Sequence, residues 1–268
     1  MDAYVLTDRE FRLFQEKIYE LAGINLTPAK KALVAHRLSR RLRHYGLKTY
    51  QEYFTIINEN LHPKEQQMMV DLLTTNETFF FREIEHFDYL RDKILPSWEP
   101  TQTFRMWSAA CSSGEEPYSA AMVIDSHKNV KTWEILASDL STRVLEKAAQ
   151  GVYPNERMQK IPTEYIKKYC LRGVRSNEGT FMIKKELRNN VRFQQINLNN
   201  PPKHLGSFDV IFLRNVLIYF DQPTKKQFVN NLIPYLKKGG HFLCGHAESL
   251  QGISTELSSV KPATYIKK

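Results

Sequence analysis

The stretch FRMWSAACSSGEEPYSAAM, residues 104–122, decides the fold. It predicts a short strand over Phe104–Trp107, a loop of small residues over Ser108–Gly114, and a helix that begins with the letters EEP. A strand that leads through such a loop into a helix brings backbone N–H groups close to a nucleotide-like ligand. The loop lacks the spacing of glycines that suits a pyrophosphate, and two carboxylates stand where a phosphate would be repelled. The pattern therefore favours a cofactor with a ribose or a cation, and S-adenosylmethionine has both.

Strands and helices alternate along the rest of the chain from Thr103 onward. Further strands are expected at residues 133–138, 191–197, 208–213 and 241–245, and helices at residues 141–150 and 224–236. We expect Gly239 and Gly240 to stop the last of these helices. The alternation predicts a mostly parallel sheet with helices on both faces. Residues 151–190 break the rhythm with polar, basic and glycine-containing sequence, which predicts a small inserted antiparallel β-subdomain.

The first 75 residues predict a separate all-helical domain. Capping boxes at Thr7-x-x-Glu10 and Thr49-x-x-Glu52 begin two of its helices, Thr27-Pro28 begins another, and the last follows Pro63. Residues 76–102 link this domain to the sheet. The motif TNETFFFRE, residues 75–83, contains three successive Phe side chains that cannot all face one core, and an amphipathic helix follows over about residues 84–95.

Composition places the chain among ordinary globular proteins, with 42% hydrophobic and 25% charged residues in a length of 268. No apolar run approaches the ~20 residues of a membrane span, and the N-terminus lacks a secretory leader pattern. We therefore expect no membrane insertion. The three cysteines are widely spaced without a CxxC pair, which favours a reducing cytoplasmic compartment and predicts no metal site. A net charge of +9 favours an acidic partner, or serves solubility alone.

Residues that can offer a polar side chain or a backbone group to a ligand lie at the ends of four predicted strands. In chain order they are Gly114 and Glu115, then Asp139, then Asn197 and Leu198, then Arg214 and Asn215. Each alone is an ordinary turn residue. Ligands of doubly wound sheets lie beyond the carboxyl ends of the strands, so the set together indicates a cofactor site. The acid that closes the second strand is placed to accept from both ribose hydroxyls, and the pair after the third strand is placed to read adenine.

Five motifs together resemble the chemotaxis receptor methyltransferase family, CheR: TNETFFFRE, WSAACSSGEEPYS, ASDLSTRVLEKAAQGVYP, FDVIFLRNVLIYFD and GGHFLCGHAES. The resemblance runs from about residue 5 to the C-terminus. It implies a helical N-terminal domain and a Rossmann-like methyltransferase domain that carries a β-subdomain. The implied activity is transfer of a methyl group from S-adenosylmethionine to glutamate side chains of membrane chemoreceptors. The products would be γ-glutamyl methyl esters, which serve sensory adaptation, and S-adenosylhomocysteine.

The resemblance also implies the roles of individual residues. Cofactor contacts are expected from Asn76, Thr78, Arg82, Glu115, Asp139, Asn197, Leu198, Arg214 and Asn215. Arg82 and Tyr219 would lie near the transferred methyl group. A glutamate carboxylate is ionised at neutral pH, so no general base is needed and none is evident. Catalysis would rest on positioning and on removal of water from the carboxylate.

Two basic clusters suggest where partners bind. On the second helix, Arg37, Arg40, Arg41 and His44 form a stripe beside an apolar face. The stripe is either a solvated face or a docking surface for the acidic cytoplasmic helices of receptors beside an anionic membrane. The second cluster, within residues 167–192, lies on the inserted β-subdomain. The resemblance implies that a receptor C-terminal peptide can bind there by adding a strand, as in some members of the family, and the sequence leaves open whether the receptors of this protein carry such a tail. We expect a cytoplasmic monomer that is recruited to receptor clusters.

Two rival functions compete with this interpretation. The positive charge favours a nucleic-acid methyltransferase, but the fourth strand is followed by Arg-Asn-Val-Leu, residues 214–217. Amino-methylating enzymes usually have an Asp/Asn-Pro-Pro-aromatic tetrapeptide there, and the basic patches lack the interleaved aromatics of single-strand binders. We therefore expect no nucleic-acid partner. The other rival is a regulatory module that binds the cofactor and transfers nothing, and the presence of Arg82 and Tyr219 argues against it.

Overall fold

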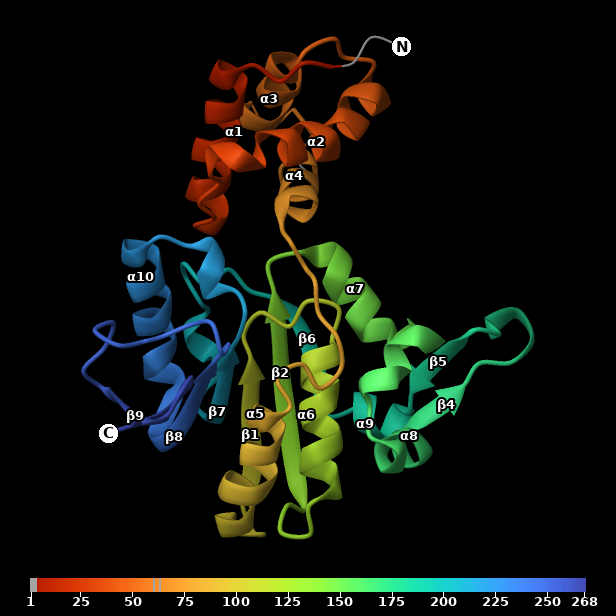
Figure 1. Cartoon of the computed structure of the whole chain (residues 1–268), viewed down its shortest axis with the longest axis vertical. Helices are drawn as coiled ribbons and strands as arrows, with labels where there is room; N and C mark the ends of the chain where they lie inside the picture. The colour runs from red at the N-terminus through yellow and green to blue at the C-terminus, as the bar shows by residue number, and fades with distance from the viewer. Residues whose placement is uncertain (1–3, 60, 63) are drawn as a thin grey trace.

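The computed structural model describes residues 4–59, 61, 62 and 64–268. Its first part is the helical bundle at the top of Figure 1. The bundle comprises α1 (Asp8–Ala22), the short 3-10 helix η1 (Pro28–Lys30), α2 (Lys31–Tyr45), α3 (Tyr50–Asn58) and α4 (Glu65–Leu73). Both predicted capping boxes form, at the starts of α1 and α3. Pro63, expected to precede the last helix, lies outside the described residues.

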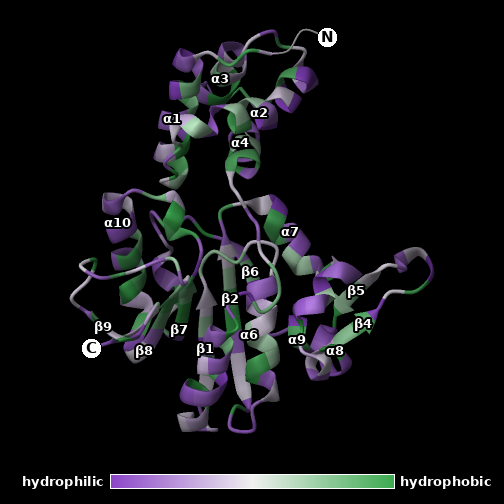
Figure 2. Cartoon of the chain, in the orientation of Figure 1, coloured by the Kyte–Doolittle hydropathy of each residue, from purple (hydrophilic) through white to green (hydrophobic). Residues whose placement is uncertain are grey.

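The bundle has an apolar core of its own, to which α1–α4 all contribute. In Figure 2 the ribbon alternates between hydrophilic and hydrophobic along these helices, as expected when only one face of each helix is buried. A carboxylate is also buried there. Glu65, 3% exposed, accepts two hydrogen bonds from Arg41 at 2.6 and 2.8 Å, one from Tyr45 at 2.9 Å and one from Tyr53 at 2.8 Å. Arg41 is therefore engaged inside the bundle.

A seven-stranded sheet forms the centre of the second part, in the order β6-β2-β1-β7-β8-β10-β9. Its strands are β1 (Thr103–Ser108), β2 (Thr132–Asp139), β6 (Val191–Gln195), β7 (Phe208–Leu213), β8 (Leu236–Cys244), β9 (Leu257–Lys261) and β10 (Thr264–Lys267). The first five are parallel, and β10 is antiparallel to both of its neighbours. The strand order reverses direction between β1 and β7, because β2 and β6 lie on one side of β1, and β7 and β8 on the other, and such sheets bind ligands at this point.

Side chains alternate between two apolar layers, one on each face of the sheet. Met106 and Phe212 belong to one layer, together with helix α6 (Glu115–Ser126) and the linker helix α5 (Glu85–Tyr89). Trp107 and Leu213 belong to the other layer, with helix α10 (Gln222–Leu232). Helix α7 (Thr142–Gln150) follows β2. These two layers confirm the predicted Rossmann-like fold with helices on both faces.

The predicted excursion after α7 is a small three-stranded antiparallel sheet in the order β3-β5-β4. Its strands are β3 (Val152–Pro154), β4 (Cys170–Arg172) and β5 (Thr180–Ile183), accompanied by the helices α8 (Thr163–Tyr169) and α9 (Lys185–Arg188). The linker helix α5 continues into a π-helical turn, η2 (Leu90–Ile94). In the described part of the chain, no helix has the length and apolar character needed to cross a membrane.

The C-terminal strands differ from the prediction. Helix α10 ends at Leu232, and Gly239 and Gly240 lie inside β8. The pairing of β7 with β8 shifts register near these glycines, and Gly239 has a φ of 75°. A Cβ on Gly240 would lie 2.8 Å from the carbonyl oxygen of Lys237, so the irregular strand needs glycine there. The short, polar strands β9 and β10 were not predicted, because neither shows a clear alternation.

The helical bundle contacts the loops at the carboxyl ends of the strands. The N–H of Asn25 donates to the carbonyl of Tyr219 at 3.0 Å, and the side chain of Asn197 donates to the carbonyl of Leu21 at 2.7 Å. On α4, Asp71 accepts from the hydroxyl of Thr142 at the start of α7, at 3.0 Å. These bonds place the bundle over the point where the sheet is expected to bind its ligand.

We predict that Glu65→Gln lowers the free energy of unfolding by about 3 kcal/mol, because it leaves the largely buried guanidinium of Arg41 without its charge partner. Urea denaturation followed by far-UV circular dichroism measures the loss. The control is Glu20→Gln, which removes the charge of an exposed carboxylate that pairs with Lys17 and should cost about 0.5 kcal/mol or less. Equal losses in the two variants would contradict the prediction.

Candidate active site

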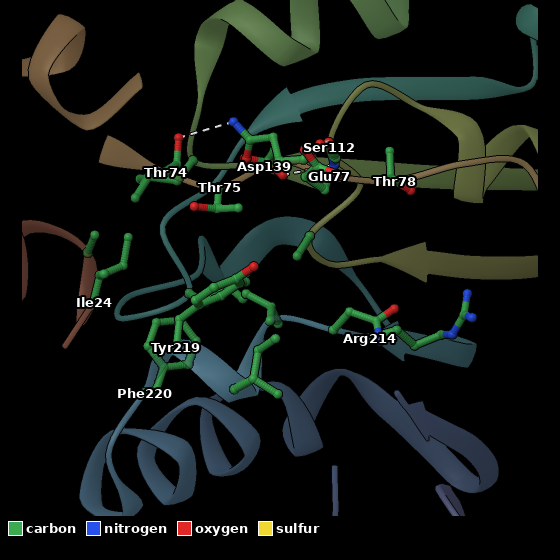
Figure 3. Close-up of a pocket in the computed structure, with 18 of the residues that line it drawn as sticks. Ile24, Thr74, Thr75, Glu77, Thr78, Ser112, Asp139, Arg214, Tyr219 and Phe220 are labelled. Atoms are coloured by element: carbon green, nitrogen blue, oxygen red, sulfur yellow. Dashed lines mark hydrogen bonds between the residues drawn. The ribbon is translucent and has the colours of Figure 1, made fainter. Parts of the chain in front are cut away.

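A cavity of about 230 Å³ opens where β1, β2 and β7 end, between the sheet, the linker and the helical bundle. Figure 3 shows linker residues Thr74–Thr78 and Asp139 on one side and Tyr219 and Phe220 on the other. Ile24 of the bundle lies at one end and Arg214 at the opposite end. The bundle therefore supplies part of the wall, a contribution that the sequence did not indicate.

The small-residue loop after β1 is held by Asp139 at the end of β2. One carboxylate oxygen accepts from the backbone N–H of Ser112 at 2.9 Å, and the other accepts from that of Ser141 at 3.0 Å. A Cβ on Gly114, whose φ is 95°, would lie 2.9 Å from the side chain of Ala148, so the tight loop requires glycine. Burial raises the pKa of Asp139. A carboxylate has about four acceptor sites, so capacity remains for the hydroxyls of a ribose.

Arg214, at the end of β7, is buried and bonded to two carboxylates. It donates to Glu116 of α6 at 2.8 Å and to Glu83 of the linker at 3.2 Å, and a further bond reaches the carbonyl of Arg82. Phe87 and Phe212 lie 5.4 and 5.5 Å from the guanidinium carbon. Burial raises the pKa of Glu116. The side chain lines the cavity, and these bonds join the linker to the sheet.

Most of the predicted cofactor residues line the cavity. They are Asn76, Thr78, Arg82, Asp139, Leu198, Arg214 and Asn215. The other two point elsewhere. Glu115 is 1% exposed and accepts from Ser113 at 2.7 Å and from Arg157 at 2.8 Å, while Asn197 bonds to the bundle. Glu116, the next residue after Glu115, lines the cavity instead.

The two predicted catalytic residues, Arg82 and Tyr219, both line the cavity. Arg82 is half-buried and donates to the carbonyl of Glu77 at 3.0 Å, which leaves its guanidinium further N–H groups for a ligand. Tyr219 comes from the short helix η7 (Leu217–Tyr219) after β7. Burial raises the pKa of Tyr219, so its hydroxyl keeps its proton at neutral pH and can donate. Arg82 and Tyr219 are thus suited to holding an anionic group in the cavity.

Glu248 was not predicted, yet it holds the segment that carries Tyr219. Its carboxylate, 7% exposed, accepts from the backbone N–H groups of Gly245 at 2.6 Å, Asn215 at 2.9 Å and Ile218 at 3.3 Å. It follows β8, about 30 residues from the segment it holds. Sequence patterns carry no sign of such a contact. Only the motif GHAES, which contains this residue, marked the region.

A second, polar cleft lies on the other side of the linker segment Thr74–Thr78. Its basic side chains are His36, Arg37, Arg40, Arg143 and Arg157. The structure thus separates the members of the predicted docking stripe. Two of its arginines, at positions 37 and 40, line the cleft, His44 is exposed elsewhere on α2, and Arg41 is bonded to Glu65.

One group in the described part of the chain has the residue types of a metal site. Ligand atoms of Glu83, His86 and His246 lie within 4.8 Å of one another. The oxygens of Glu83 already accept from Arg214, from Asn215 at 2.9 Å and from the N–H of His246 at 3.2 Å. The adjacent guanidinium would also repel a cation. The geometry therefore does not favour a metal centre.

Comparison with known proteins places this geometry in a family. The model of the all-alpha domain of CheR methyltransferases matches residues 9–74, and the model of their SAM-binding domain matches residues 76–266. Chemotaxis protein methyltransferase 2 of Pseudomonas aeruginosa is 41% identical over 262 residues, which cover 97% of this chain and 93% of the relative. The chemotaxis protein methyltransferase of Escherichia coli is 40% identical over 247 residues, covering 91% and 85%. These matches confirm the resemblance and the predicted cofactor.

We predict that His86 makes stability fall in mild acid. Burial, with the nearby positive charge of Arg214, lowers the pKa of His86 to about 3. Between that value and the unfolded pKa of about 6.5, the unfolded chain binds one more proton than the folded chain. The free energy of unfolding therefore falls with pH by up to about 1.4 kcal/mol per unit.

Urea denaturation at pH 7.5 and pH 5.5 tests this role of His86. Wild-type protein should lose about 1 kcal/mol more between the two pH values than His86→Gln, which cannot take up that proton. Equal losses would show that another group is responsible.

Proposed function

Since the chain belongs to the CheR family of S-adenosylmethionine-dependent methyltransferases of chemotaxis, we propose that it methylates glutamate side chains of membrane chemoreceptors. The products are γ-glutamyl methyl esters. The observation that carries the proposal is that Arg82 and Tyr219 both line the cavity. Together they suit a carboxylate substrate, which a guanidinium binds through paired N–H groups. An amine or a nucleobase would gain little from that interaction.

The residues of the cavity fit the cofactor. The spare acceptor sites of Asp139 suit the ribose hydroxyls, and the apolar side chains of Ile24 and Leu198 suit an adenine ring. Bound S-adenosylmethionine supplies an electrophilic methyl group on a positively charged sulfur. The carboxylates of Glu116 and Glu77, which also line the cavity, favour that positive charge.

The chain's own residues then position and desolvate the substrate. We assign to Arg82 the binding of the glutamate carboxylate through paired N–H groups, and to Tyr219 a hydrogen bond to the same group. No general base is needed, because the glutamate carboxylate is already ionised when it binds and the methyl ester forms from it without loss of a proton. The apolar side chains of Phe79 and Ile218, at the cavity wall, help exclude water from the carboxylate.

We assign substrate docking to the basic cleft beside the linker, to which Arg37 and Arg40 of the predicted stripe contribute. Arg37, Arg40 and Arg143 give this surface a positive potential that suits the acidic cytoplasmic helices of receptors. In the β-subdomain, β4 is an edge strand that contains the exposed Leu171, which suits a receptor C-terminal peptide added as a fourth strand. The proposal has the enzyme act in the cytoplasm as a monomer recruited to receptor clusters.

The test is incubation with radiolabelled S-adenosylmethionine and membranes that contain receptors. Methyl esters of glutamate release methanol in base, so label on the receptors should be alkali-labile. Alkali-stable label on protein, or label on nucleic acid, would indicate one of the rival methyltransferases. Cofactor binding without any transfer would indicate a regulatory module.

We predict that Arg82→Ala lowers kcat by about 100-fold and changes the Kd for S-adenosylhomocysteine by about threefold or less, because its main contact is with the substrate. Asp139→Asn provides the contrast and should weaken cofactor binding by about 10-fold or more, since a charged acceptor is lost. Isothermal titration and single-turnover methylation measure the two quantities. Equal losses of kcat and affinity in Arg82→Ala would make Arg82 a cofactor residue.

We predict that Arg40→Glu raises KM for receptors by about 10-fold at low salt, with less effect at high salt where docking is screened. Arg40 is exposed on α2 and lines the basic cleft. The control is Lys226→Glu, an equal charge change at an exposed position of α10. A similar rise in KM for both variants would show that net charge, not the cleft, attracts the receptor.

A further inference from the structure

The linker backbone is strained on both sides of Arg82. Phe81 and Glu83 each have a φ of 55°, in the left-handed region that residues other than glycine rarely adopt. A bulky aromatic residue is particularly unfavourable there. Such a conformation persists only where the surrounding structure holds it, and it is concentrated at functional sites. The contacts of these two residues therefore decide where the side chain of Arg82 points.

Each side of the turn is held by a different part of the sheet domain. On one side, the N–H of Phe81 donates to the hydroxyl of Ser119 on α6 at 3.0 Å, and its ring stacks on Tyr165 with centroids 5.6 Å apart. On the other side, the carboxylate of Glu83 accepts from Asn215 at 2.9 Å and from Arg214 at 3.2 Å. The turn is thus fastened both to α6 and to the end of β7.

Glu83 does not line the cavity itself, but residues that it contacts do. It is absent from the described cavity wall, whereas Arg82, Arg214 and Asn215 are all part of it. Arg214 also bonds to the carbonyl of Arg82, so a single guanidinium holds the backbone of Arg82 and the side chain of Glu83. Without the charge of Glu83, Arg214 would still be paired with Glu116 at 2.8 Å. The ion pair between Arg214 and Glu116 would remain, and the ion pair that joins the linker to Arg214 would be lost.

We propose that Glu83 is a positioning residue for methyl transfer, which fixes the strained turn and thereby directs Arg82 toward the substrate carboxylate. This role rests on the proposed function, in which Arg82 binds that carboxylate. A displacement of about 1 Å at a reacting group can cost about 100-fold in rate. Loosening the turn should therefore lower kcat while cofactor affinity stays nearly constant, because the contacts assigned to the ribose lie on Asp139.

The experiment measures receptor methylation at saturating S-adenosylmethionine, the Kd for S-adenosylhomocysteine and the melting temperature of Glu83→Gln. We expect kcat to fall by about 10-fold to 100-fold, with Kd within about twofold of wild type. The matched control is Glu85→Gln, the same change two residues further along the linker, where the side chain is 63% exposed. It should leave all three quantities unchanged. An unchanged kcat in Glu83→Gln would overturn the proposal.

A double-mutant cycle separates positioning from a merely structural role. If Glu83 acts through Arg82, Glu83→Gln should cost nothing further in kcat once Arg82 is replaced by alanine. A further fall in the double variant, of the same size as in the single variant, would overturn the proposal. If Glu83→Gln lowers the melting temperature, Glu83→Asp takes its place in the cycle, since it keeps the charge and shortens the reach.

The controls also separate this inference from the proposed function. Wild-type protein that gives no alkali-labile label on receptors would overturn the proposed function, and the role of Glu83 with it. Labelled receptors together with an unchanged rate in Glu83→Gln would overturn the positioning role alone.

Discussion

The guanidinium of Arg214 lies buried between two aromatic rings and two carboxylates, and three parts of the cavity meet there. Glu116 lies in the first turn of α6, Glu83 lies in the linker, and Arg214 directly follows β7. A buried arginine is stable only with such partners. The pairing therefore couples the fold of the sheet to the path of the linker. That path in turn decides which side chains face the cofactor.

Sequence reasoning was most successful where local rules apply. The capping residues Thr7 and Thr49, and the strand–loop–helix unit around Gly114, depend on neighbours a few positions away. It was wrong about Gly239 and Gly240 because two glycines after a helix usually mark its end, whereas here the pairing of β8 with β7 requires them. Tertiary pairing overrode a local signal.

The site shows the same division between local and distant contacts. The strand-end position of Asp139 was predictable, because parallel strands end at one edge of a sheet. The sequence did not show that Glu116 rather than Glu115 faces the cavity, since one residue on a helix turns a side chain by about 100°. Nor did it show that Glu248 holds the segment of Tyr219, because that contact joins residues that are distant along the chain.

The helical bundle has two distinct surfaces, one that lines the cavity and one that lines the basic cleft. Ile24 and Lys30 lie in the cavity wall, while Arg40 is exposed beside the linker on the following helix. Under the proposed docking role, the outward positions of α2 are the ones open to change as receptors diverge. The inward positions must keep their fit to a small molecule that stays the same. A bundle transplanted whole from a distant relative would carry both surfaces with it, so under the proposed docking role a new receptor preference is introduced most simply by substitution on the outer face.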